Sequence, residues 1–454
     1  MGSHFGKAHY KILKPQENGK GVAVFNESNS GESDESRAKA SKVSTWKAIV
    51  NITSFVQGVG TLALPYAVLK GGIATVISFP LFALIHWYTG KIMVDCLYDD
   101  KEKEISEYDT LQPDTDKETK ESKKLRIRNS YSELGKVLWP QYGSTFLDVL
   151  QNVDLSTLGV SYLISCGSLM EHAIPNVGLT QAMWASIIAA VVLPSTFVKD
   201  LACVAWQSII SVASLTILVS VLVWFTFSHS LEINLKHFLF WDTEGALVAF
   251  GLVISSYCVY SILIPVEESM VDPSRFGSAL GSSLLLAAIF KLTFSLCGFL
   301  AFSRNTDEVI GNNFPPGAAR TMVSVAYVTY VIFSYTLTIY PVFQSLDESR
   351  MARIVSSFIP SFIWTVTTRF LAVFATLLIA VAIPHFALLT AFVGSLALPF
   401  LEYILPCLVH LKLNWLHLKP FQIAADVVVI ITGLLGTVFG VYFSGKALVV
   451  EMSN

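Results

Sequence analysis

The stretch Gln57-Gly58-Val59-Gly60-Thr61-Leu62-Ala63-Leu64-Pro65 places two glycines and a proline in the middle of an apolar segment long enough to cross a membrane. Glycine and proline both weaken a regular helix, so this composition favours local unwinding. Unwound backbone at that depth is tolerated only where it is buried in protein or lines a cavity, because lipid cannot hydrogen-bond to the freed amides and carbonyls. The stretch therefore predicts a broken membrane helix whose main-chain groups face the protein interior.

The composition of the whole chain indicates that lipid is its main solvent. Of the 454 residues, 53% are hydrophobic and only 14% are charged, whereas about 25% of the residues in a soluble globular domain are charged. A spanning helix needs about 20 largely apolar residues. Such windows occur at residues 46–69, 72–97, 144–172, 179–197, 203–227, 244–267, 278–302, 320–345, 361–383, 385–411 and 421–445. We therefore predict an all-α integral membrane protein of about eleven transmembrane helices.

A second interruption occurs in the sixth of these windows. The run Ser255-Ser256-Tyr257-Cys258-Val259-Tyr260-Ser261-Ile262-Leu263-Ile264-Pro265 is polar at mid-depth and ends in proline. The two interruptions are five spans apart, so they enter the membrane from opposite faces. This is typical of an inverted repeat of two five-helix halves, here followed by one extra helix. The alternative is that the small residues only let neighbouring helices pack closely.

The distribution of basic residues predicts the orientation. With the N-terminus in the cytosol, 23 of the 31 Lys and Arg residues lie on the inner side and five on the outer side. Cytosolic loops carry an excess of these residues, so we expect the C-terminus in a lumen or outside the cell. The expected organisation is a disordered cytosolic tail at 1–43, a transmembrane domain at 44–445 with a cytosolic loop at 99–136, and a short luminal or extracellular tail at 446–454.

The two breaks predict a site for a small zwitterion. Free helix N-termini attract a carboxylate, while exposed carbonyls and hydroxyls hold an ammonium group or a coupling ion. A neutral amino acid suits such a site. The expected binding residues are those of the two breaks: Gln57, Gly58, Val59, Gly60, Thr61, Ser255, Ser256, Tyr257 and Tyr260.

Four titratable residues are candidates for proton coupling. Asp154 and Lys291 stand near the middle of the third and seventh spans, where a charged side chain is costly unless it is paired or neutralised. The alternative for them is a fixed ion pair that only locks two helices. Glu267 follows the second break, although its closeness to the cytosolic face makes a solvated anion the alternative. His385 stands at an outer turn, where an imidazole could sense an acidic lumen or have a purely structural role.

The motifs of this chain resemble those of the amino acid/auxin permease family. The resemblance rests on the first break with Leu64-Pro65-Tyr66-Ala67, on Lys291, and above all on Pro384-His385-Phe386-Ala387-Leu388-Leu389. Within the family the chain is most similar to the vesicular inhibitory amino acid transporters, and the resemblance covers nearly everything from the first to the last span. Those transporters also carry an acid in the third span, where this chain has Asp154.

The resemblance implies proton-linked loading of GABA or glycine into acidic vesicles. The chain departs from the vesicular transporters at Gly60-Thr61, where they carry bulkier residues. Less bulk beside the expected pocket could admit larger neutral amino acids. A transporter of broader specificity in the plasma or lysosomal membrane is therefore the alternative.

Other functions compete with proton-coupled transport. Coupling to sodium, or to chloride, is a rival within the same class, and Thr329 and Ser334 in the eighth span could complete a sodium site. An amino acid sensor that signals through its long N-terminal tail is a rival from another class. We expect no organic cofactor, and the transport unit is expected to be a monomer in the lipid bilayer.

The sequence argues against three further classes of protein. We find no set of nucleophile, base and metal ligands that would indicate an enzyme, and no ring-forming selectivity motif of a channel. The net charge is only −3 and is spread over separate tails, so no nucleic-acid surface is expected.

Overall fold

The computed structural model describes residues 43–99, 125–197, 201–228, 242–347, 349–355 and 360–453. Residues 1–42, which form nearly all of the expected N-terminal tail, lie outside the described residues. The first half of the described chain contains α2 (Thr45–Val56), η2 (Val59–Ala63), α3 (Leu64–Gly71), α4 (Ile73–Asp95), α5 (Tyr131–Leu138), α6 (Gly143–Ala173), η3 (Pro175–Val177), α7 (Gln181–Ser195) and α8 (Leu201–Ser228).

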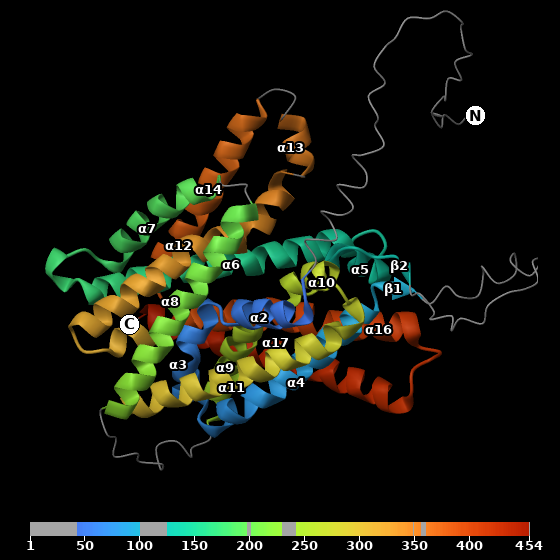
Figure 1. Ribbon diagram of the computed structural model, residues 1–454, viewed down its shortest axis with the longest axis horizontal. Helices are drawn as coiled ribbons and strands as arrows, with labels where there is room; N and C mark the ends of the chain where they lie inside the picture. The colour runs from blue at the N-terminus through green and yellow to red at the C-terminus, as the bar shows by residue number, and fades with distance from the viewer. Residues whose placement is uncertain are drawn as a thin grey trace, which may run out of the picture. The chain divides into compact units, whose positions relative to one another are not determined.

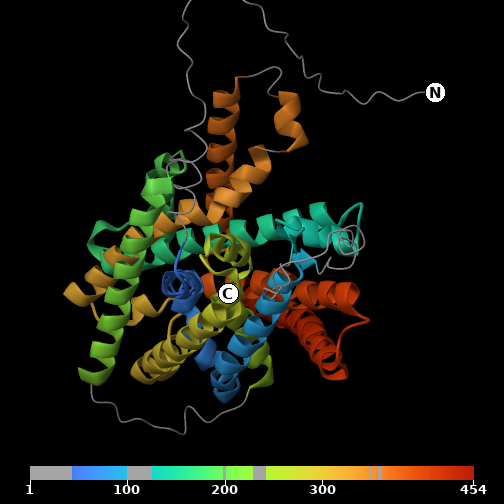
Figure 2. The ribbon, with the colours of Figure 1, turned by 45° about the vertical axis from the view of Figure 1, so that its right-hand side comes forward.

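The second half of the chain is also helical. It contains α9 (Thr243–Tyr257), α10 (Tyr260–Ser269), η5 (Pro273–Arg275), α11 (Phe276–Phe302), η6 (Ser303–Asn305), η7 (Ile310–Asn313), α12 (Ala318–Asp347), α13 (Arg350–Val355), α14 (Ser361–Ala382), α15 (Phe386–Leu398), η8 (Pro399–Ile404), α16 (Leu405–Asn414) and α17 (Pro420–Ser453). In Figure 1, α2, α3 and α9 lie in the middle of this bundle, and Figure 2 shows α16 and the beginning of α17, in red, at one side of it.

The helical membrane class predicted from composition is confirmed. Among the described residues, eight helices are long and apolar enough to cross a membrane, and a ninth span results if the bent pair formed by α2 and Val59–Gly71 is counted as one. The apolar helices Gln181–Ser195 and Thr216–Ser228 are shorter. Every predicted window falls on a helix or a broken helix, while the number of eleven crossings stays a prediction.

The polar segments between and after the spans contain more regular structure than expected. In the described part of the predicted 99–136 loop, β2 (Leu125–Arg126) pairs antiparallel with β1 (Tyr98–Asp99). Helix α5 follows because Ser130 accepts a hydrogen bond from the Glu133 amide, while the Glu133 carboxylate accepts one from the Asn129 amide. Reciprocal bonds of this kind start a helix. At the other end α17 continues to Ser453, so most of the expected tail at 446–454 is helical.

Both predicted breaks are present. Helix α2 ends at Val56, and the chain resumes as the 3₁₀ helix η2 after Gln57 and Gly58, with a bend of 52°. Pro65 then occupies the first turn of α3, where a missing amide hydrogen costs little. In the sixth span, α9 and α10 are separated by Cys258 and Val259.

The two breaks touch each other through their main chains. A Cβ atom added to Gly60 would lie 3.1 Å from the Ser256 Cα and 3.2 Å from its amide nitrogen. Helix α15 crosses the same region, because a Cβ on Gly251 would lie 2.1 Å from the Ala391 carbonyl oxygen. Glycine is therefore needed at these positions for the three segments to approach so closely.

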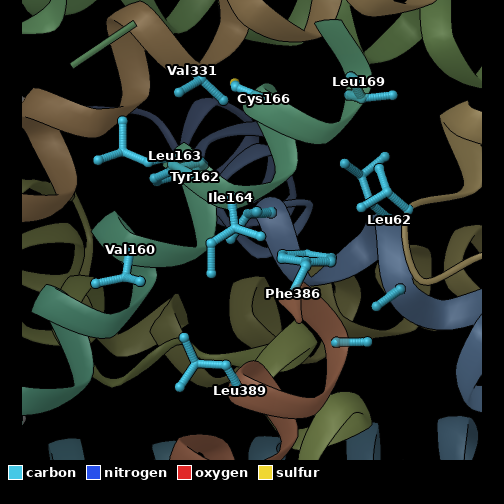
Figure 3. Packing of buried hydrophobic residues seen from close by; sticks show 14 of the residues in the cluster. Leu62, Val160, Tyr162, Leu163, Ile164, Cys166, Leu169, Val331, Phe386 and Leu389 are labelled. Carbon is cyan, nitrogen blue, oxygen red and sulfur yellow. The ribbon is translucent and has the colours of Figure 1, made fainter. Parts of the chain in front are cut away.

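Apolar side chains surround the first break. Figure 3 shows Ile164 of α6 beside Phe386 of α15, with Leu62 of η2 on the other side of that ring. All three are buried in one hydrophobic cluster. The break is thus shielded from lipid by helices from both halves of the chain.

We expect Gly251→Ala to destabilise the protein, since the new methyl group would overlap the α15 backbone. Overpacking of this kind typically costs about 1–3 kcal/mol. Thermal unfolding of the detergent-solubilised protein measures the effect as a lower Tm. Gly277→Ala is the matched control, because its Cβ would meet only the Lys91 side chain at 3.6 Å. Equal Tm values for the two variants would contradict the packing.

Candidate functional site

Lys291 binds to the first break. Its amino group donates to the carbonyl of Val56, the last residue of α2, at 2.9 Å and to the Thr61 hydroxyl at 3.2 Å. The nitrogen also lies 5.3 Å from the centre of the Tyr257 ring, on the second broken span. Lys291 and Thr61 are both buried. The Val56 carbonyl freed by the break is therefore satisfied by a side chain from α11, which also binds the Thr61 hydroxyl.

Gln57 leaves an unused acceptor in the same break. The residue is 6% exposed, and its side-chain oxygen is buried without a hydrogen-bond partner among the described residues. Leaving a buried acceptor unpaired costs free energy. The first amides of η2, at Val59 and Gly60, also have no carbonyl within their own helix to bind. A ligand with an ammonium group and a carboxylate could satisfy both kinds of group.

The second break is capped by a carboxylate that our sequence analysis did not select. Glu402, in the π-helical segment η8, accepts hydrogen bonds from the amides of Val259 at 2.7 Å and Tyr260 at 3.2 Å. Its second oxygen lies 2.8 Å from Nε2 of His86 on α4. Both side chains are buried. A negative group at a helix start is favourable because the first amides point toward it.

Tyr260 connects this cap to Asp154. The tyrosine hydroxyl donates to the Asp154 carboxylate at 2.9 Å, while its amide donates to Glu402. Asp154 is 3% exposed. The fixed ion pair between Asp154 and Lys291, weighed as an alternative above, is not formed between these two described side chains. The third span is instead linked to the start of α10.

The hydroxyls of Ser255, Ser256 and Tyr257 are all engaged in hydrogen bonds, two with other helices and one within α9. Ser255 donates to the Thr390 carbonyl on α15, Ser256 to the Val253 carbonyl of its own helix, and Tyr257 to the Phe79 carbonyl on α4. In this conformation it is the backbone at Ser256 that contacts the first break. Substrate binding by these three side chains stays a prediction.

A small cavity lies beside the start of α10. Its volume is about 10 Å³, and Thr89, Tyr131, Tyr260 and Glu402 are among the residues that line it. A cavity of roughly this size accommodates about one water molecule. Residues with polar side chains from four elements therefore line this cavity.

Glu267 lies in the last turn of α10. It accepts a hydrogen bond from the Tyr98 hydroxyl, and its other oxygen is 3.3 Å from an Arg126 nitrogen, an ion-pair distance without hydrogen-bond geometry. Glu267 is 1% exposed, so it does not match the alternative of a solvated anion. The side chain of the adjacent Glu268 is exposed and does match it. The β1–β2 ribbon thus contacts the C-terminal end of the second broken span.

His385 directly precedes α15 and lies beside an acid that the sequence analysis missed. Its Nδ1 is 3.8 Å from one oxygen of Glu308, and the other oxygen accepts a hydrogen bond from the Ala387 amide at the start of α15. Burial raises the pKa of the Glu308 carboxyl to about 7, against the opposing effect of the Ala387 amide. Nothing in the sequence between α11 and α12 distinguishes Glu308 as a functional residue.

The residues expected to bind sodium are both on α12. The Thr329 hydroxyl donates to the Val325 carbonyl of the same helix, and Ser334 is buried one to two turns further on. Helix α12 packs mainly against α6 and α8. The sodium site stays a prediction.

Glu402 and His86 were missed although a signal was present. Both lie inside predicted spans, at 385–411 and 72–97, and the rule that selects Asp154 as an intramembrane charge applies equally to Glu402. A lone histidine in an apolar span carries a weaker signal. Their pairing could not be foreseen, because they are 316 residues apart in the sequence.

Comparison with known proteins places the chain among transporters. The family model described as "Transmembrane amino acid transporter protein" matches residues 41–445. The vesicular inhibitory amino acid transporter of Xenopus laevis is 28% identical over 458 residues, which cover 98% of this chain and 84% of that protein. The human protein of the same name is also 28% identical, over 90% of this chain and 77% of its own length.

Two further matches extend this result. The vesicular GABA transporter of Caenorhabditis elegans is 27% identical, over 91% of this chain and 82% of that protein. The solved structure titled "Inward facing conformation of Mhp1" aligns with a TM-score of 0.53 at 12% identity and covers 91% of both chains. At that identity the likeness shows a shared fold alone. Because the family model spans most of the sequence, the chain belongs to the transmembrane amino acid transporter family, whose members are multi-pass membrane transporters and not enzymes.

Proposed function

We propose that the chain is a proton-coupled secondary transporter of small neutral amino acids such as GABA or glycine, and that it loads acidic vesicles. The observation that carries this proposal is the hydrogen bond between Tyr260 and Asp154. It joins a buried carboxyl of the third span to the first residue of α10 in the broken sixth span. Binding or release of a proton at Asp154 would therefore change a contact that positions one side of the site.

The chemistry of the first break supports a zwitterionic substrate. The free Gln57 oxygen suits an ammonium group, and the first amides of η2 suit a carboxylate. The space left by the missing side chain of Gly60 is filled by the Ser256 backbone. The small residue at this position therefore serves helix packing and does not enlarge a pocket, which favours small amino acids over a broader range.

The position of Lys291 supports protons over sodium as the coupling ion. Its amino group already occupies the Val56 carbonyl and the Thr61 hydroxyl, the kind of oxygens that a sodium ion would need at a broken helix. Sodium coupling through Thr329 and Ser334 is the rival. The names of the vesicular relatives support a vesicle membrane, with the plasma or lysosomal membrane as the alternative.

We expect Asp154→Asn to abolish amino acid accumulation driven by a pH gradient while the protein stays folded. The change removes the titrating group and keeps an acceptor for Tyr260. The measurement is uptake of labelled GABA, glycine and larger neutral amino acids into proteoliposomes with an acidic lumen, with and without a protonophore. Asp148→Asn, the same change near the inner end of α6, is the control and should leave accumulation intact.

The same assay tests the coupling ion and the substrate. Wild-type uptake should persist when choline replaces sodium and should stop with the protonophore. If no amino acid moves, or if choline abolishes uptake, the proposed function is wrong. Unchanged accumulation by Asp154→Asn would leave this residue with a structural role.

We expect the stability of the protein to fall as the pH rises through about 7, because of Glu308. The folded protein holds this proton up to about pH 7, whereas the unfolded carboxyl releases it near 4.5. The stabilisation is therefore complete below pH 4.5 and lost above 7. The shift corresponds to roughly 3 kcal/mol.

A comparison of Tm values at pH 5 and pH 8 checks this dependence. Glu308→Gln cannot ionise, so its Tm should exceed that of the wild type at pH 8 and match it at pH 5. Glu244→Gln, at an exposed position of the outer face, is the control and should behave as the wild type does. A Glu308→Gln variant with the wild-type pH dependence would rule out this residue as the source.

A further inference from the structure

The hydrogen bonds around His86 require one proton between this side chain and Glu402. Nδ1 of His86 lies 2.7 Å from the Phe82 carbonyl oxygen, which can only accept, so Nδ1 carries a hydrogen. Nε2 lies 2.8 Å from the second carboxylate oxygen of Glu402. This contact is a hydrogen bond only if a second hydrogen is present, either on Nε2 or on the carboxyl oxygen.

The other oxygen of Glu402 cannot hold that hydrogen. It already accepts from the amides of Val259 and Tyr260. The proton is therefore confined between the second oxygen of Glu402 and Nε2 of His86. Without it, the lone pair of a neutral imidazole would face a carboxylate oxygen at 2.8 Å, which is repulsive. Nδ1 also lies 3.4 Å from the Tyr403 hydroxyl, but in a neutral imidazole with its hydrogen on Nε2 the Nδ1 lone pair would face the Phe82 carbonyl oxygen. Only the protonated pair therefore satisfies both the Phe82 contact and the Glu402 contact.

The pair lies where the second broken span resumes as α10. Glu402 holds the first two amides of α10, and His86 holds Glu402 from α4, in the other half of the inverted repeat. Loss of the proton would leave the neutral imidazole one hydrogen for two acceptors, so His86 would lose its contact with either Glu402 or the Phe82 carbonyl. Loss of the Glu402 contact would weaken the cap on α10. The arrangement therefore couples the charge of the pair to the position of the second broken span.

The surroundings contain one further acid that could share the proton. Five titratable groups lie close enough to interact with the charge of Glu402. They are Asp154 from α6, Tyr131 from α5, Cys258 and Tyr260 at the second break, and the adjacent Tyr403. Of these, only the Asp154 carboxyl ordinarily ionises below neutral pH. Tyr260 contacts both acids, and the one-water cavity lies beside Tyr260 and Glu402.

We propose that Glu402 and His86 form a second proton-binding site of the transport cycle, in which a shared proton holds the start of α10 and its release frees α10 to move. This inference rests on the proton coupling proposed above. In this inference the proton of the Glu402–His86 pair controls the movement of α10. Asp154 is the neighbouring acid with which the pair exchanges this proton. The transferred species is a proton alone, which passes between oxygen and nitrogen without any change of oxidation state.

The test compares two transport modes of the reconstituted full-length chain. One is exchange of labelled for unlabelled amino acid at equal pH on both sides, and the other is uptake driven by a pH gradient. Glu402→Gln keeps an acceptor for the α10 amides but cannot ionise, and His86→Gln removes the imidazole. For both variants the ratio of gradient-driven uptake to exchange should fall by about tenfold or more, and exchange should lose its pH dependence.

His410→Gln is the matched control. His410 is also buried and lies 2.8 Å from an acid, Asp426, but this pair contacts neither break in the described part of the chain. Its ratio of uptake to exchange should remain at the wild-type value. An equal fall in this control would mean that any buried histidine pair gives the effect, and the inference would be overturned.

Three outcomes separate this inference from the proposed function. If the wild type accumulates substrate and Glu402→Gln does so with the same pH profile, only the inference fails. It fails as well if folded Glu402→Gln and His86→Gln lose exchange and uptake in equal proportion, because the pair is then only a structural cap. If the wild type exchanges substrate but never responds to the pH gradient, the proposed function fails first.

Discussion

The main-chain groups freed at two helix breaks must be satisfied inside the protein, and the rest of the structure depends on this requirement. At the end of α2 a freed carbonyl, that of Val56, receives the Lys291 amino group. At the start of α10 two freed amides bind the Glu402 carboxylate. The charge of each partner agrees with the helix dipole, because the C-terminal end of a helix attracts a cationic donor and the N-terminal end attracts an anion. Each break is thus bound by a titratable side chain from another span.

The close approach of the two breaks makes these side chains parts of one site. Gly60 brings the η2 backbone against Ser256, and Gly251 brings α9 against α15. With the main chains in direct contact, neither break can move far without displacing the other. A substrate held at the first break and a proton held at the second would therefore act on the same packed interface.

The acids of this protein recur at the starts of helices. Glu402 binds the Val259 and Tyr260 amides at the start of α10, and Glu308 binds the Ala387 amide at the start of α15. In both places a histidine lies beside the acid, His86 in the interior and His385 just before α15. Each of these two helix starts is therefore bound by a carboxylate that has a histidine as its neighbour.

Local properties of the sequence determined the helical membrane class, the positions of both breaks and the choice of Asp154 and Lys291, because apolar length, helix-breaking residues and buried charge can all be recognised within one span. Partners were decided only by the tertiary structure. Asp154 binds Tyr260 instead of Lys291, and Glu402 binds His86, which is 316 residues away in the sequence. Glu402 also lies in a π-helical segment that no residue pattern predicted. The reason is physical: unwinding depends on a few neighbouring residues, whereas hydrogen-bond pairing depends on how distant helices pack.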